Sequence, residues 1–296
     1  MTPVTDRLPR PPLLACVVLA LGDPPELPVA VDSLLAQEEP VEVVVVRSAA
    51  GACSSLAAAG VTVPLVERPE RLLPGAARNL GIASTRAPFV AFLASDCWAE
   101  PGWAAARVRA HRAGAAAVAS AVTNPYRRSL AAWASYVALF ARRMPGVPPA
   151  DALLYGASYD RALFDRCGTF REDLRGGEDT EFHERLAAAG VELAWEPAVR
   201  TAHRHPRSVK ALLGDQYRRG ARSAASWARL SGPRPGQVAI NALRRVPAGV
   251  VMAWRSAEAG ERPWIAAASL LLPAAALAYA AGALAAARSP ERGETP

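Results

Sequence analysis

Two adjacent carboxylates, Glu178 and Asp179, stand in the first turn of a predicted helix and could work as a general base. They follow the glycine pair at 176–177, and Phe182 and Leu186 then share one face at helical spacing. Acidic residues are also favoured in any first helical turn, because the helix dipole stabilises negative charge there. From this segment alone, capping and catalysis both explain the pair.

Other residues with useful chemistry come directly after apolar runs. Arg47 follows the Val-rich run 41–46, and Ser95 and Asp96 follow the run 89–94. Such runs alternate with helical patterns over the first hundred residues, which predicts an α/β fold with a mostly parallel sheet flanked by helices. Because ligands bind at the carboxyl ends of strands in such sheets, these residues are candidates for a binding site.

The composition limits the classes of partner. The formal net charge is +7, and Lys210 is the single lysine among 34 basic residues. A basic surface suits phosphate groups or anionic lipid. The arginines are dispersed and are not interleaved with aromatic residues, so we expect no nucleic-acid partner. The four cysteines have no paired spacing, which is typical of buried free thiols and argues against a zinc site.

The C-terminal region contains a long uncharged stretch, residues 264–287, flanked by Arg262 and Arg288. A helix of this length crosses a hydrocarbon core of about 30 Å, so we predict one transmembrane helix; a buried helix is the alternative. Basic residues gather before it, which predicts an inner (cytoplasmic) membrane protein whose preceding domain faces the cytoplasm. The short apolar segment 246–254 would lie in the membrane interface or form part of a hairpin.

These patterns predict four parts of the chain. Prolines dominate the beginning, and a run of Gly and Pro separates the α/β pattern from the apolar C-terminal region. The predicted parts are a disordered N-terminus (1–12), a catalytic domain (13–230), a linker (231–236) and a membrane-associated region (237–296).

Several short motifs occur in a fixed order along the chain. They are the Val-rich strand, the segment Ala77-Arg78-Asn79-Leu80-Gly81-Ile82, the strand Phe89 to Ala94 with Ser95-Asp96, Gly156 before a Tyr-Asp-Arg helix, and Gly177-Glu178-Asp179. In this order and spacing they resemble glycosyltransferase family 2, whose members have the GT-A fold. The resemblance extends from about residue 13 to about residue 222.

The resemblance implies a nucleotide-sugar donor bound across the strand ends, with a divalent metal, Mg²⁺ or Mn²⁺, neutralising its diphosphate. It implies that Asp179 is the base that deprotonates the acceptor hydroxyl, and that Glu178 either orients this base or accepts a hydrogen bond from an acceptor hydroxyl. Asp96 would be the metal or diphosphate ligand, with Ser95 beside it. A metal ligand is also expected near the late strand, where His203 is a candidate.

The same resemblance gives Arg78 and Asn79, on one helix, the role of donors to the nucleotide; a surface arginine beside a capping asparagine is the alternative. The sequence departs from the family at two places. Arg47-Ser48-Ala49-Ala50 replaces the usual Asp-Asp-Gly-Ser, and Ala94 replaces the first Asp of the Asp-x-Asp metal motif. An arginine at position 47 could hold phosphate and take over part of the neutralisation.

We therefore expect an inverting glycosyltransferase that transfers a sugar to a hydroxyl acceptor. The predicted membrane anchor suggests that the acceptor is lipid-linked or part of an envelope glycan. The alternative is a catalytically degenerate protein of the same fold that acts as a membrane partner or a nucleotide-sugar sensor. Ala94 and Arg47 favour this alternative, whereas the intact Glu178-Asp179 pair favours the enzyme.

Overall fold

The computed structural model describes residues 11–229 and 234–288. The chain divides into two compact units, which are treated separately below. The first unit comprises the chain up to Ala119, Tyr155–Asp173 and Gly177–Val199; the second comprises Ser120–Leu154, Leu174–Gly176 and the chain from Arg200 onward. Most of the predicted disordered N-terminus and the first half of the predicted linker, residues 231–233, lie outside the described residues.

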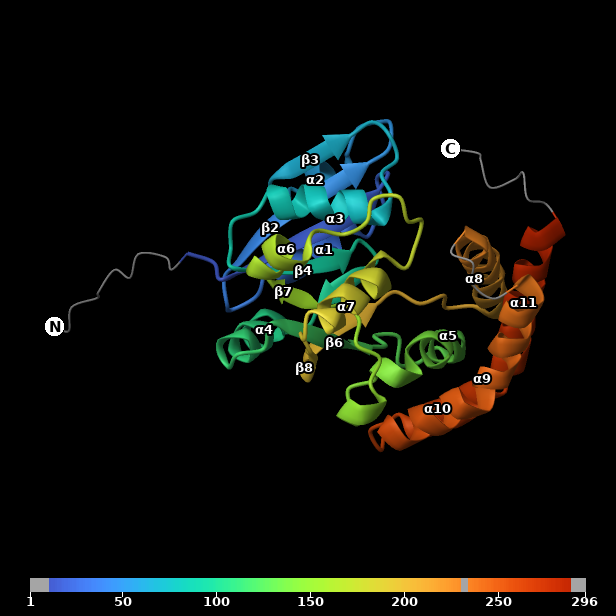
Figure 1. Ribbon diagram of the computed structural model, residues 1–296. Helices are drawn as coiled ribbons and strands as arrows, with labels where there is room; N and C mark the ends of the chain where they lie inside the picture. Colours follow the sequence, from blue (N-terminus) through green and yellow to red (C-terminus); the bar gives the residue numbers. More distant parts are fainter. Residues whose placement is uncertain (1–10, 230–233, 289–296) are drawn as a thin grey trace. The chain divides into compact units, whose positions relative to one another are not determined.

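A mixed sheet forms the centre of the first unit (Figure 1). Its spatial order is β3-β2-β1-β4-β7-β6-β8-β5, and β6 and β8 run on into the second unit. The strands β1 to β4 are parallel, whereas β7 is antiparallel to β4 and β6. The strand bounds are β1 Leu14–Leu21, β2 Val41–Ser48, β3 Leu65–Arg68, β4 Phe89–Ala94, β5 Cys97–Ala99, β6 Ala117–Thr123, β7 Ser158–Asp160 and β8 Leu193–His203.

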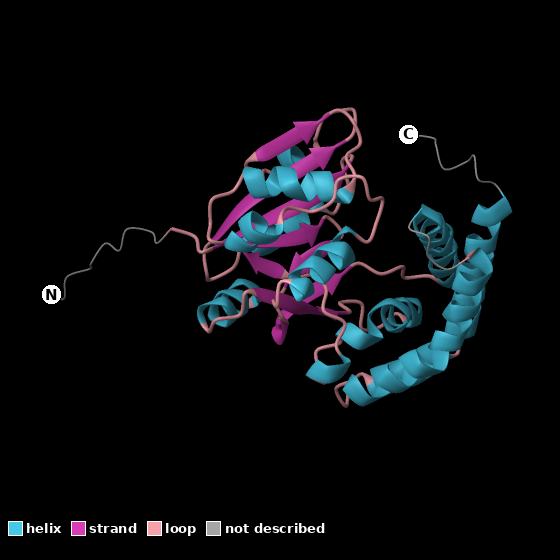
Figure 2. Ribbon diagram, in the orientation of Figure 1, coloured by secondary structure: helices cyan, strands magenta, loops and turns pink. Residues whose placement is uncertain are grey.

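Helices cover both faces of this sheet, as the α/β pattern predicts (Figure 2). Side chains of β1 alternate between the two faces: Cys16 and Val18 pack with α1 and α4, whereas Val17 packs with α3, α6 and α7. The helix bounds are α1 Leu27–Leu35, α2 Ser55–Ala58, α3 Pro74–Ala83, α4 Trp103–Arg112, α6 Ala162–Cys167 and α7 Glu178–Ala188.

The second unit is mainly helical. Two of its helices, α8 and α11, approach closely at two glycines: a Cβ on Gly220 would lie 1.9 Å from the carbonyl oxygen of Tyr279, and one on Gly282 would lie 1.9 Å from that of Tyr217. The helices are α5 Leu130–Phe140, α8 Val209–Arg229, α9 Pro235–Ser256, α10 Arg262–Ser269 and α11 Leu272–Arg288, with 3₁₀ turns η1 Ala141–Arg143 and η2 Pro149–Asp151.

The prediction of one transmembrane helix over 264–287 is wrong, because the stretch forms two helices, α10 and α11, separated at 270–271. Pro273 accounts for the break, since a proline ring clashes with the carbonyl four residues earlier, here that of Ser269. Within the described residues, no single helix combines the length and apolarity needed to cross a membrane. The pair Arg262–Ser269 and Leu272–Ala286, bent by 54°, meets these two criteria only when taken together.

Candidate active site

The carboxyl ends of the parallel strands in the first unit meet at one edge of the sheet. The register pairs Leu21 with Ser48, Arg47 with Glu67, and Leu19 with Ala94. The loops after β1, β2, β3 and β4 therefore begin side by side, which is where ligands bind in sheets of this kind.

The N-terminus of α7 carries the two predicted acidic residues. Gly177 precedes the helix with φ +85°, a left-handed conformation that favours glycine. Glu178 is buried and forms an ion pair with Arg78 of α3. Asp179 is half-buried, and its Oδ1 accepts a hydrogen bond of 2.9 Å from the amide of Thr180. The ion pair therefore accounts for the buried position of Glu178, whereas the side chain of Asp179 helps to order the first turn of α7.

Arg78 connects α7 to the sheet. Its guanidinium carbon lies 5.5 Å from the ring centroid of Phe92 on β4 and 5.2 Å from that of Phe170. Burial lowers the pKa of Arg78, and the negative charge of Asp179 partly offsets this effect. The residue is thus a largely buried cation that lies over two aromatic rings, pairs with Glu178 and feels the charge of Asp179.

The residue one turn after Asp179 on α7 is His183. It is half-buried, and its Nε2 lies 2.7 Å from the hydroxyl of Tyr159 on β7. Burial lowers the pKa of His183 and raises that of Tyr159, so both groups are neutral at pH 7. Tyr159 was not predicted as a site residue, although it belongs to the Tyr-Asp-Arg segment of the sequence motif.

Asn79, next to Arg78 on α3, has its side chain engaged within the protein. Its Nδ2 donates to the carbonyl of Phe170 at 2.9 Å and to Glu172 at 2.8 Å, and its Oδ1 accepts from the amide of Phe170 at 3.0 Å. These bonds fix the loop that carries Phe170 against α3. A contact between Arg78 or Asn79 and a nucleotide stays a prediction.

Arg47 lies at the end of β2 with 2% of its surface exposed. Its Nε donates to the carbonyl of Gly22 at 2.9 Å, Nη1 to Glu67 at 2.9 Å, and Nη2 to the carbonyl of Ala50 at 3.3 Å. One guanidinium therefore ties the loops that follow β1 and β2 to strand β3. A role in holding phosphate stays a prediction.

Ser95 and Asp96 form the turn between β4 and β5. The amide of Ser95 donates to the carbonyl of Leu19 at 3.2 Å, which fixes the turn beside the end of β1. Asp96 is half-buried, and its Oδ1 lies 3.6 Å from the Sγ of Cys97. The other predicted metal ligand, His203, ends β8 in the second unit, so a metal shared by the two residues stays a prediction.

Asp23 is an acidic residue at the same sheet edge that sequence reasoning did not single out. It accepts hydrogen bonds from the amide and hydroxyl of Ser54, at 2.9 and 2.7 Å, and from Ser55. These bonds hold the pKa of Asp23 well below its usual range. Its carboxylate is therefore committed to ordering the start of α2.

A family model described as "Glycosyl transferase family 2" matches residues 16–164, which is half of the chain. The chain belongs to glycosyltransferase family 2. The match covers the strand ends and Arg78 but stops before α7, so the assignment of Glu178 and Asp179 rests on the sequence motif and the geometry above.

Curated relatives and solved structures agree with this membership. Two proteins named pre-mycofactocin glycosyltransferase, from Mycobacterium tuberculosis strains CDC 1551 and H37Rv, are each 30% identical over 207 residues. These matches cover 65% of this chain and 41% of each relative, so the chain spans less than half of their length.

Two solved structures share the fold. The first is the mannosyltransferase PcManGT from Pyrobaculum calidifontis in complex with GDP-Man and Mn²⁺, with a TM-score of 0.52, 21% identity, and coverage of 94% of this chain and 75% of that one. The second is GalNAc-T7 with UDP, GalNAc and Mn²⁺, with a TM-score of 0.51, 15% identity, and coverage of 74% and 51%. At these identities the likeness establishes the α/β fold alone.

Proposed function

We propose that this protein transfers a sugar from a nucleotide-sugar donor to a hydroxyl acceptor with inversion at the anomeric carbon. The observation that carries the proposal is the position of Asp179. Its carboxylate stands at the N-terminus of α7, half-buried beside the buried pair of Arg78 and Glu178. A base in such a charged and ordered setting is oriented before the acceptor arrives.

The chemistry assigned to the site is a single displacement. Asp179 accepts the proton of the acceptor hydroxyl, the hydroxyl oxygen forms a bond to the anomeric carbon, and the bond to the nucleoside diphosphate breaks with its electron pair on the diphosphate. Among the described residues we assign one base and no second nucleophile to this site, which predicts inversion. Arg78 holds Glu178 in place by an ion pair and partly compensates the charge of Asp179.

A divalent metal fits the residues at the sheet edge. Mg²⁺ is usually held by one or two carboxylates together with substrate phosphates, and Asp96 provides one carboxylate while Ala94 provides none. When bound, the metal would stabilise the charge of the departing diphosphate. Both fold relatives are complexes with Mn²⁺ and a nucleotide or nucleotide-sugar, which supports a metal of this class.

Binding of a nucleotide-sugar without turnover is the second candidate function. Arg47 favours it, because the guanidinium that replaces the usual acidic residue is almost fully buried and donates to Gly22, Glu67 and Ala50. Ala94 removes one carboxylate that would bind the metal, and Arg47 already has hydrogen-bond partners. Such a site would bind the donor more weakly than a site with the full Asp-x-Asp motif.

The test is a thermal-shift and calorimetric panel of nucleoside diphosphates and their sugars, each with and without Mn²⁺ or Mg²⁺. The transferase is expected to bind one donor, to release its diphosphate with an acceptor alcohol, and to form a product of inverted anomeric configuration by NMR. Binding without release supports the sensor, and a retained configuration contradicts the single displacement. Failure to bind any nucleotide would contradict both candidate functions.

We also propose a lipid-linked or envelope-glycan acceptor and attachment of the helical unit to the surface of the cytoplasmic membrane, with the active site in the cytoplasm. Exposed apolar side chains on α9 and around α11 support attachment, among them Trp254, Leu270 and Leu277. Arginines such as Arg255 would complement anionic lipid. Membrane fractionation followed by a high-salt wash tests this: surface attachment predicts partial release by salt, and a protein found wholly in the soluble fraction contradicts it.

A further inference from the structure

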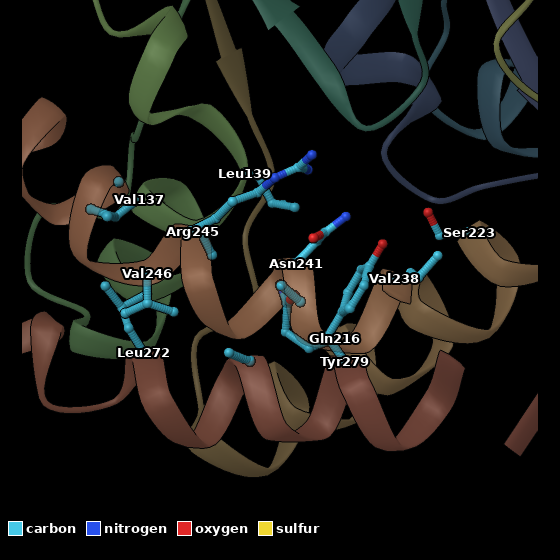
Figure 3. A pocket seen from close by; sticks show the side chains of 14 residues that line it. Val137, Leu139, Gln216, Ser223, Val238, Asn241, Arg245, Val246, Leu272 and Tyr279 are labelled. Atoms are coloured by element: carbon cyan, nitrogen blue, oxygen red, sulfur yellow. The ribbon is translucent and has the colours of Figure 1, made fainter. Parts of the chain in front are cut away.

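The helical unit contains a pocket of about 310 Å³, formed by residues of α5, α8, α9 and α11 (Figure 3). This volume lies at the lower end of the range for small-molecule sites, about 300–1,000 Å³. Most of the lining is apolar, and α11 runs along the lower side of the pocket in Figure 3, carrying Leu272 and Tyr279. None of the residues assigned to the sugar-transfer site lines this pocket.

Gln216 of α8 is a polar residue in this lining with only 3% of its surface exposed. Its Nε2 makes no hydrogen bond within the described part of the protein. A buried donor without an acceptor is unfavourable, and such groups are rare in folded proteins. The pocket therefore offers an unused donor to the oxygen of a bound molecule.

Arg245 of α9 contributes the positive charge of the lining. Its side chain is exposed, and in Figure 3 its guanidinium lies on the side of the pocket opposite α11. Within the described residues no carboxylate pairs with it. Its neighbour Arg244 is also exposed but does not line the pocket, so one of two adjacent arginines faces this site.

The apolar walls, the unused donor and the rim cation together define a ligand. We propose that the pocket binds a small anionic amphiphile: an apolar body inside, an oxygen that accepts the Gln216 hydrogen bond, and an acidic group at Arg245. This site goes beyond the proposed sugar transfer, and it remains testable if that function fails, because its readout is binding alone.

Dansylglycine is a suitable probe, because it combines a naphthalene body, sulfonamide oxygens and a carboxylate. Dansylamide is the matched probe without the carboxylate. With the full-length protein we expect saturable one-to-one binding by fluorescence, and dansylglycine should bind about two- to fivefold more tightly than dansylamide. Arg245→Gln should abolish this difference, whereas the neighbouring Arg244→Gln should leave it intact.

Two further variants test the interior of the pocket. Gln216→Leu should weaken both probes by about two- to tenfold without lowering the melting temperature, because it removes a donor that has no partner in the free protein. Gly249→Leu should abolish binding by filling the space, since nothing lies within 4 Å of a Cβ at Gly249. Gly236→Leu on the same helix is the control, because it meets equally open space but does not line the pocket.

Each outcome bears on the proposal. Loss of binding in Gly249→Leu but not in Gly236→Leu, together with the dependence on Arg245, supports it. Absence of saturable binding, or equal binding of both probes to native protein and to Gly249→Leu, overturns it. Binding that survives Gly249→Leu yet responds equally to Arg244→Gln and Arg245→Gln also overturns it, because it indicates surface charge instead of this pocket.

Discussion

The proposed base, Asp179, lies near one cation, Arg78, and near the ring side chains of Tyr159 and His183. Arg78 pairs with Glu178 and partly compensates the charge of Asp179. His183, one turn further along α7, and Tyr159 of β7 both stay neutral. The carboxylate is thus oriented by groups that do not compete for the acceptor proton. This arrangement separates the two roles open at the sequence level: Glu178 holds the helix to α3, and Asp179 is left for the acceptor.

Replacing Asp179 by Asn should lower kcat by roughly 10²–10⁴-fold, because an amide cannot accept the acceptor proton. Donor affinity and melting temperature should change little, since the Asn oxygen can still accept the hydrogen bond from the Thr180 amide. Steady-state kinetics and donor calorimetry measure both. Glu184→Gln, on the exposed face of α7, is the control, and an equal loss there would contradict the base assignment.

Replacing Arg78 by Met should cost about 3–5 kcal/mol of unfolding free energy, because Glu178 would keep a buried charge without its partner. The double change Arg78→Met with Glu178→Gln should recover part of this loss. Urea unfolding gives both values, and Arg86→Met at an exposed position is the control. If the double variant is no more stable than the single one, the ion pair is not what holds these residues.

The partner of Arg78 could not be inferred from the sequence. The pair joins α3 to α7 across a long stretch of chain, and only the fold brings the two helices together. The same holds for Arg47, whose hydrogen bonds reach the loops after β1 and β2 and a side chain within β3. Local patterns predict which residues stand at helix and strand ends, but they do not reveal which of these residues neutralise one another.

Among the elements, those with local boundary signals were predicted well. The helix Pro74–Ala83 begins at a proline, and α7 lies between Gly177 and Gly190. The apolar pattern predicts a strand over 61–66, but β3 is Leu65–Arg68; the carbonyl of Pro64 accepts a hydrogen bond of 2.9 Å from the amide of Val45, while Pro64 itself has no amide to donate. Pairing with β2 then extends the strand into polar residues.

β8 is longer than predicted, and α10 and α11 are shorter than the single helix predicted from hydropathy. The apolar pattern predicts a strand over 192–195, but β8 continues past Pro197 to His203. Hydropathy averages over a window and does not register the backbone clash that Pro273 imposes. Both differences involve a proline. Pro197 does not end its strand, whereas Pro273 does break the helix.

The contact between α3 and β1 depends on a glycine. A Cβ at Gly81 would lie 2.2 Å from Cγ1 of Val17, whereas nothing lies within 4 Å of a Cβ at Gly249 in α9. Gly81→Ala should therefore destabilise the protein by about 1–3 kcal/mol through overpacking. Gly249→Ala should stabilise by up to about 1 kcal/mol through helix propensity. Chemical denaturation of both variants tests the contrast, and equal effects would refute the close packing of α3 on β1.

The packing of α4 includes a buried polar side chain, His111, so the stability of the protein should depend on pH. His111 contacts the hydroxyl of Ser158 at 2.8 Å and the carbonyl of Ala115 at 2.7 Å, and burial lowers its pKa to about 4. The unfolded chain, with a pKa near 6.5, binds the proton more readily, so stability should fall as the pH drops from about 6.5 to about 4, by roughly 3 kcal/mol at most. Urea unfolding across this range should show a shallower slope for His111→Gln; an unchanged slope would contradict the assignment.

Because the chain forms two compact units, they can unfold separately or in a single cooperative step. A Cβ at Gly282 would collide with the backbone of α8, so Gly282→Ala should loosen the helical unit. Hydrogen exchange followed by mass spectrometry should report faster exchange in α8 and α11 and unchanged exchange in β1 and β4. Equal acceleration in the sheet would mean that the two units form a single cooperative structure.

The two glycine contacts between α8 and α11 also determine when the helical unit can be completed during synthesis. α8 ends at Arg229, but the helix that covers Gly220 begins at Leu272. At translation rates of about 5–20 residues per second, α8 emerges seconds before its partner. During that interval its small-residue surface has no α11 to pack against. Chaperone contact with the nascent chain should therefore concentrate on α8 and end when α11 has been made.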